Sequence, residues 1–113
     1  MQYNNENIFA KILKKEIPST PIYEDDKVFA FNDIAPKAKT HILVIPKGEF
    51  ISFIDFTEKS SADDVAYFFK KVEEIAKNAG LESYRIVANC GADAGQVVPH
   101  FHIHILSGDI QNF

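Results

Sequence analysis

The sequence has no tryptophan, one cysteine, one methionine, and only five glycines and five prolines among 113 residues. A single cysteine excludes a disulfide within the chain. No stretch approaches the roughly 20 consecutive apolar residues that a membrane-spanning helix requires. Residues 1–7 also lack the basic start and apolar centre of a secretory signal peptide. We therefore expect a cytoplasmic protein that has no membrane partner.

Positive charge is scarce as well, because 12 Lys and Arg residues stand against 16 Asp and Glu residues, giving a formal net charge of −4. Without a basic surface, a nucleic acid is not an expected partner, although this argument does not extend to a single nucleotide. The length, the 46% hydrophobic content and the ten phenylalanines predict one domain over residues 1–113, with a hydrophobic core of its own.

Three of the four histidines occupy every second position of one short run, at His100, His102 and His104. Alternate side chains of an extended strand share a face, so three imidazoles are expected on one side and Phe101 and Ile103 on the other. Histidine changes charge near neutral pH. One ring can therefore stay neutral as a nucleophile or base while its neighbours supply charge and protons. The run predicts a chemical function.

Two other interpretations of the run stay open. The histidines could be structural, or they could bind a metal. Strand geometry, with a rise of about 3.3 Å per residue, separates the first and third histidines by roughly 13 Å, too far for one zinc ion with bonds of about 2.0–2.1 Å. Two neighbouring histidines would need further ligands, and His41 and Cys90 are the remaining histidine and cysteine. We expect neither a metal nor another cofactor.

The apolar pattern predicts an α+β fold in which an antiparallel sheet of about five strands packs with two main helices. The first helix is expected over residues 6–15, with Asn5 or Asn7 as its cap. The second begins after Ser60 or Ser61, carries a broad apolar stripe over residues 65–79 and ends at Gly80. Strands are expected at residue 23 and at 28–31, 40–45, 84–88 and 100–106, whereas residues 50–56 are expected to be irregular.

The loop over residues 89–96 precedes the histidine run. Gly91 and Gly95 allow its backbone amides to turn toward a ligand, and the small residues around Gln96 leave room for an anionic group. Backbone amides beside imidazoles can neutralise a phosphate. The loop is therefore predicted to form a phosphate-binding nest, although a glycine-containing connection between strands is the simpler alternative.

The run from His100 to Leu106 matches the motif His-φ-His-φ-His-φ-φ, where φ is apolar, and the chain resembles the Hint branch of the histidine triad (HIT) nucleotide-binding proteins. The resemblance extends from about Ile8 to Gly108. Its other blocks are Ile8-Phe9, Glu16-Ile17-Pro18, Phe31-Asn32-Asp33-Ile34, Thr40 to Lys47, and Gly95-Gln96. It implies a HIT-like fold, a homodimer, and a purine nucleoside phosphoramidase or nucleotidyl hydrolase that binds AMP or GMP and their phosphoramidates.

By the same resemblance, His102 attacks the α-phosphorus and carries the nucleotide until water releases it. The leaving amine needs a proton, which His104 or His100 could hold nearby. His41 has a supporting role, and Asp33 binds the ribose hydroxyls. The remaining residues expected to bind the nucleotide are Ile8, Phe9, Ile12, Ile17, Phe31, Asn32, Ile34, Asn89, Gly95, Gln96, Val97 and Val98.

The sequence departs from the family pattern at several positions. Asn7 and Ala10 replace a Cys-x-x-Cys pair that binds structural zinc in many members, so we predict no such site. Val97 replaces a common serine that bonds the phosphate or the leaving amine, and Asn32 replaces a common histidine. Two alternative functions therefore stay open: dinucleoside polyphosphate hydrolysis, and nucleotide-dependent regulation with weak catalysis.

Overall fold

The computed structural model describes residues 2–113. Within them, five antiparallel strands form one sheet in the order β1-β2-β3-β5-β4. The strands are β1 (Pro21–Glu24), β2 (Val28–Asn32), β3 (Thr40–Pro46), β4 (Arg85–Val87) and β5 (Ile103–Ser107). The helices are α1 (Ile8–Leu13), α2 (Phe53–Lys59), α3 (Ala62–Asn78) and the 3₁₀ turn η1 (Ala92–Ala94). The predicted α+β fold with a five-stranded antiparallel sheet is confirmed, and β3 lies at its centre.

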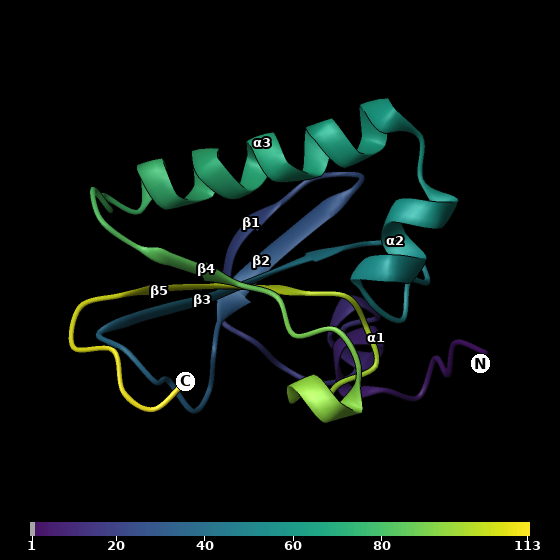
Figure 1. Cartoon of the computed structure of the whole chain (residues 1–113), viewed down its shortest axis with the longest axis horizontal. Coiled ribbons are helices and arrows are strands. Elements are labelled where there is room, and N and C mark those ends of the chain that lie inside the picture. The colour runs from purple at the N-terminus through teal and green to yellow at the C-terminus, as the bar shows by residue number, and fades with distance from the viewer. Residues whose placement is uncertain (1) are drawn as a thin grey trace.

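The sheet has a hydrophobic core on each face, because successive strand residues point to opposite sides. In β3, Ile42 and Val44 pack beneath α2 and α3, whereas Leu43 and Ile45 pack against α1. Figure 1 shows α3 along one side of the sheet and α1 on the other. His104 pairs with Leu43 across β3 and β5, so its ring lies on the α1 face. This face carries the candidate site.

The two predicted helices are confirmed at slightly different bounds. Asn7 caps α1, its side chain accepting the Ala10 N–H at 2.9 Å. The helix ends at Leu13, and Lys15 beyond it takes a left-handed φ of 64°. Ser61 caps α3 by accepting the Asp64 N–H at 3.1 Å. The buried part of its stripe comprises Phe68, Val72, Ile75 and Ala76, while Ala79, expected to be buried, is exposed.

The expectation of irregular structure over residues 50–56 is wrong, because α2 begins at Phe53. Ser52 accepts the Asp55 N–H at 3.4 Å, and the Asp55 carboxylate accepts the Ile51 N–H at 2.8 Å. This reciprocal cap satisfies N–H groups at the start of the helix. Phe53 and Phe56 are three residues apart and therefore lie on one side of α2, over the core that contains Phe56.

The histidine run enters the sheet later than predicted, since β5 begins at Ile103. The N–H of Phe101 bonds to the carbonyl of Phe50 at 2.8 Å, which holds this part of the run outside the strand ladder. The predicted alternation still holds, because Phe101, Ile103 and Ile105 belong to the core beneath α3. Among residues 2–113, no helix combines the length and apolarity that crossing a lipid bilayer requires.

Candidate active site

His102 presents one ring nitrogen with a lone pair. Its Nδ1 lies 2.6 Å from the carbonyl oxygen of His100. A carbonyl only accepts, so Nδ1 carries the proton and Nε2 is unprotonated. Within residues 2–113, Nε2 has no hydrogen-bond partner. Every fully buried side-chain nitrogen or oxygen in this range does have a partner, so Nε2 is not sealed off from a ligand. Burial lowers the pKa of His102, which keeps the ring neutral at pH 7. This geometry leaves the Nε2 lone pair available to attack an electrophile.

His100 uses both of its ring nitrogens inside the protein. Nε2 donates to the Pro46 carbonyl at 2.9 Å, so Nδ1 is the acceptor for the Tyr3 hydroxyl. The residue is fully buried, and burial lowers its pKa to about 4. The sequence left the proton donor open between His100 and His104. The structure favours His104, because the ring of His100 has no nitrogen left for a ligand.

His104 is held by a chain of hydrogen bonds that begins at a backbone amide. The Lys37 N–H donates to Nδ1 of His41 at 3.0 Å, which places the His41 proton on Nε2. This Nε2 lies 3.0 Å from Nδ1 of His104 and donates to it, so the proton of His104 lies on Nε2. Burial, with the nearby His102 and His41, lowers the pKa of His104 to about 3. His104 is therefore a neutral hydrogen-bond donor.

Asp33 lies beside the same pair of histidines. Its Oδ2 is 3.4 Å from Nε2 of His41, while its Oδ1 accepts the Ala35 N–H at 2.8 Å. One ligand atom each from Asp33, His41 and His104 falls within 4.8 Å of the others, a spacing that a metal ion could bridge. However, a metal would need the lone pair of His41 Nε2, where the Lys37 amide places the proton. The donor set fits a hydrogen-bonded chain better than a metal centre.

A cavity of about 450 Å³ lies on the same face of the sheet, within the size range of ligand pockets. The ring of Phe9 in its wall lies edge-on to His102, with the ring centroids 4.9 Å apart, so the cavity adjoins the proposed nucleophile. Asp33 is the one charged residue among those that line it. The cavity brings together nine of the residues predicted to bind the nucleotide: Ile8, Phe9, Ile12, Ile17, Phe31, Asn32, Asp33, Ile34 and Val98.

Four other predicted nucleotide-binding residues lie outside that wall. Gln96 and Val97 line a separate cavity beside α2. The Gln96 side chain accepts the Gly91 N–H at 2.8 Å and donates to the carbonyls of Ile51 and Val98, so it holds the loop together. The other two residues, Asn89 and Gly95, lie next to each other. Nδ2 of Asn89 is 4.0 Å from the position that a Cβ on Gly95 would take.

The N–H groups of both loop glycines are used inside the loop, so they do not contribute to the predicted amide nest. Gly91 and Gly95 adopt left-handed φ values of 94° and 91°, and the chain between them closes on itself as η1. The N–H groups of residues 91 and 94–96 bond within the loop. The N–H groups of Val97 and Val98, in contrast, have no partner among the described residues. These two amides, unlike those of the glycines, are free to donate to an anion.

Sequence reasoning missed three residues that shape the site. Tyr3 and Lys37 act on His100 and His41. Phe113 packs its ring against His104, with the ring centroids 4.5 Å apart. The Lys37 contact comes from the backbone, so no residue type could reveal it. The other two residues lie near the ends of the chain, without a neighbouring motif to mark them.

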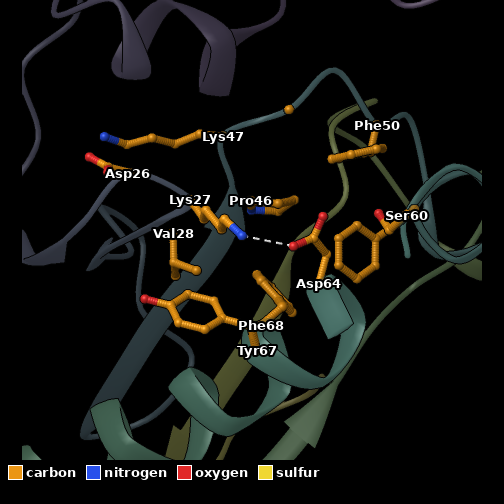
Figure 2. A pocket seen from close by; sticks show the side chains of 12 residues that line it. Asp26, Lys27, Val28, Pro46, Lys47, Phe50, Ser60, Asp64, Tyr67 and Phe68 are labelled. Atoms are coloured by element: carbon orange, nitrogen blue, oxygen red, sulfur yellow. Dashed lines mark hydrogen bonds and ion pairs between the residues drawn. The ribbon is translucent and has the colours of Figure 1, made fainter. Parts of the chain in front are cut away.

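A further cavity of about 300 Å³ lies away from the histidines, on the face of the sheet that α2 and α3 cover. Figure 2 shows Lys27 and Asp64 meeting beside it, and their ion pair measures 2.9 Å. Lys47 on its rim pairs with Glu24 at 2.7 Å. These lysines are already paired, and no histidine lines the cavity. His104 and the larger cavity beside it lie on the opposite face of the sheet.

Comparisons with known proteins agree with this arrangement. The HIT domain family model matches residues 14–111. An uncharacterized HIT-like protein of Rickettsia prowazekii (strain Madrid E) is 50% identical over 108 residues, 94% of this chain and 90% of that protein. A histidine triad protein structure from Clostridium difficile has a TM-score of 0.84 and 44% identity and covers 97% of both chains. A histidine triad nucleotide-binding protein from Candida albicans has a TM-score of 0.81 and 30% identity, covering 95% of this chain and 80% of its own.

Proposed function

This chain belongs to the HIT domain family, and from that premise we propose that it hydrolyses the P–N bond of purine nucleoside phosphoramidates through His102. The observation that carries the proposal is the unprotonated Nε2 of a buried, neutral imidazole that adjoins an apolar cavity. Neutral imidazole is a competent nucleophile at pH 7 and also a good leaving group. The proposal needs neither a metal nor another cofactor.

The reaction has two displacements at the α-phosphorus. In the first, Nε2 of His102 bonds to phosphorus while the P–N bond breaks, and the leaving nitrogen takes a proton from solvent as the amine departs. In the second, water attacks phosphorus, the bond to Nε2 breaks, and the proton lost by the water restores the balance. His104 contributes its Nε2–H as a hydrogen-bond donor to the reacting group.

The cavity supports a nucleoside as the recognised part of the substrate. Its wall is largely apolar, with Phe9, Ile12 and Phe31 among its residues, and such a surface suits the faces of a purine. Asp33 offers carboxylate oxygens, which pair with hydroxyl donors such as those of a ribose. The Candida albicans relative is named a nucleotide-binding protein, which agrees with this assignment.

The decisive experiment compares the wild type with His102→Gly in the presence of a chelator. With adenosine 5′-phosphoramidate as substrate, we expect turnover to fall by on the order of 10⁴-fold, because the nucleophile is lost. AMP binding should change little, and added imidazole should restore part of the activity by filling the vacated space. Undiminished turnover by the variant would refute the role of His102.

The same assay distinguishes the alternative functions. Faster hydrolysis of a diadenosine polyphosphate than of the phosphoramidate would place the chain among dinucleoside polyphosphate hydrolases. AMP binding without any nucleotidyl-histidine adduct would favour a regulatory protein with weak catalysis. Loss of activity in the chelator would contradict a metal-independent mechanism.

We also propose that the chain forms a homodimer. Strand β4 is a sheet edge that pairs only with β5 among the described residues, and Ile86 on it is half exposed. An uncovered edge with an apolar side chain is a ready surface for pairing with a second copy. Sedimentation is expected to give twice the mass of the chain, whereas Ile86→Lys should shift the protein toward monomer. A wild-type monomer at assay concentrations would contradict this proposal.

A further inference from the structure

Asp33 and His41 are in contact although the displacement at phosphorus does not require it. Nε2 of His41 carries one proton and faces two acceptors, His104 Nδ1 at 3.0 Å and Asp33 Oδ2 at 3.4 Å. His41 is buried, with 3% of its surface exposed, so water does not substitute for either acceptor. A single N–H thus connects a residue in the cavity wall with the hydrogen-bond donor of the reaction.

The two acceptors compete for that proton. One N–H cannot make two full hydrogen bonds, and the distances show that His104 holds the shorter one. A group that hydrogen-bonds to the Asp33 carboxylate would spread its negative charge and weaken its attraction for the His41 proton. Because a carboxylate only accepts, that group must be a donor. A hydroxyl of a ligand in the cavity meets this requirement, since Asp33 is the charged residue in the wall.

We propose that Asp33 and His41 couple the hydroxyl groups of the bound ligand to the tautomer of His104. With the hydroxyls on Asp33, the His41 N–H hydrogen-bonds to Nδ1 of His104 without competition, and His104 keeps its own proton on Nε2 for the reacting group. Without them, Asp33 competes as an acceptor for the His41 N–H, the hydrogen bond to Nδ1 of His104 weakens, and the tautomer of His104 with its proton on Nδ1 becomes more populated. His41 is then a positioning residue, and the ligand hydroxyls are the ribose hydroxyls if the proposed function holds.

The backbone makes the coupling directional. The Lys37 N–H keeps Nδ1 of His41 unprotonated, so His41 cannot respond by exchanging its own tautomer. The Lys37 carbonyl, in the next peptide group, accepts the Gln111 N–H at 2.7 Å, which ties the backbone at Lys37 to the last residues of the chain. The Phe113 ring packs on both His41 and His104 and limits the access of water to their contact. The His41 N–H therefore has two acceptors to bond to, Asp33 and His104.

Kinetics test the coupling with two substrates, a purine nucleoside phosphoramidate with an intact ribose and its 2′,3′-dideoxy analogue. In the wild type we expect removal of the hydroxyls to lower kcat by about tenfold, the effect of roughly 1.4 kcal/mol, in addition to raising KM. In His41→Leu, which has no N–H, kcat should no longer depend on the sugar. His41→Gln, which retains a side-chain N–H, should restore part of the dependence. An equal kcat ratio in the wild type and His41→Leu would overturn the inference.

Nitrogen-15 NMR of the wild-type imidazoles tests the same idea without turnover and without a variant that could fail to fold. AMP should place the His104 proton on Nε2, and 2′,3′-dideoxy-AMP should leave more of it on Nδ1. If the spectra show this difference while the phosphoramidate is not hydrolysed, the coupling stands and the proposed reaction fails. If the enzyme hydrolyses the phosphoramidate but the His104 tautomer is the same with AMP and 2′,3′-dideoxy-AMP, the proposed reaction stands and the coupling fails.

Discussion

The buried His100 predicts a specific loss of stability in acid. In the folded protein its Nε2 donates to the Pro46 carbonyl and its Nδ1 accepts from Tyr3, so a second proton would have to enter a fully buried, already satisfied ring. Burial accordingly lowers its pKa from 6.5 to about 4. In the unfolded chain the ring is hydrated, and its pKa is expected near 6.5. The unfolded state therefore binds more protons between these two values.

The sign and size of the effect follow from this difference. His100 contributes its full stabilisation above about pH 6.5, and this is lost as the pH falls toward the folded-state pKa near 4. Between pH 7 and pH 4 the loss from His100 alone is about 3 kcal/mol. That is a large part of the roughly 5–15 kcal/mol by which domains are stable. His104, whose pKa burial lowers to about 3, changes stability in the same direction.

Urea unfolding of the wild type and His100→Gln at pH 7, 6, 5 and 4 measures the effect. Glutamine keeps a side-chain N–H for the Pro46 carbonyl but does not titrate. The variant should be less stable at pH 7, and its free energy of unfolding should fall by about 3 kcal/mol less than that of the wild type on going to pH 4. This difference corresponds to about 1–3 M in the urea midpoint. Parallel pH dependences of the two proteins would refute the reasoning.

Three further substitutions test other parts of the structure. Asn7→Ala removes the α1 cap and should lower the stability measured in thermal unfolding by about 1 kcal/mol. Titration should also show weaker nucleotide binding, because Phe9 in the cavity wall lies on that helix. Unchanged binding would show that the cap does not affect the cavity. Phe101→Ala empties a core position that is 2% exposed. It should lower the free energy of unfolding in urea by about 3–5 kcal/mol. A decrease below about 1 kcal/mol would mean that neighbouring side chains fill the cavity. Gly108→Ala adds a Cβ at φ +79°, 3.1 Å from the Cβ of Lys39, and should cost about 1 kcal/mol or more in thermal unfolding, whereas an unchanged midpoint would argue against strain there.

The elements that the sequence predicted are those with local signals. Asn7 and Ser61 precede helices as caps, and the apolar run over residues 40–45 became the central strand β3. The helix α2 was missed although it also has a local signal, the reciprocal cap of Ser52 and Asp55. The expected irregular stretch over residues 50–56 overlaps the start of this helix of seven residues, which has Phe56 as its buried residue.

The glycine loop shows a different limit of sequence reasoning. Gly91 and Gly95 were expected to turn backbone amides toward a ligand, yet with their left-handed φ values their own N–H groups bond within the loop. The outcome depends on which carbonyl each N–H reaches, and the side chain of Gln96 also takes the Gly91 N–H. Residue types constrain φ but do not assign hydrogen-bond partners.

The histidines also differ in how much of their arrangement is local in sequence. Their spacing of two predicted a common face, and the bond from His102 Nδ1 to the carbonyl of His100 lies within the run itself. The tautomer of His104, by contrast, depends on His41, which reaches it only once β3 and β5 are paired, and through His41 on the backbone amide of Lys37. The proposed nucleophile can therefore be picked out from a motif, whereas the hydrogen-bonded state of its neighbour His104 cannot. A substitution that shifts the Lys37 peptide without changing any histidine should alter His104 while leaving the lone pair of His102 in place.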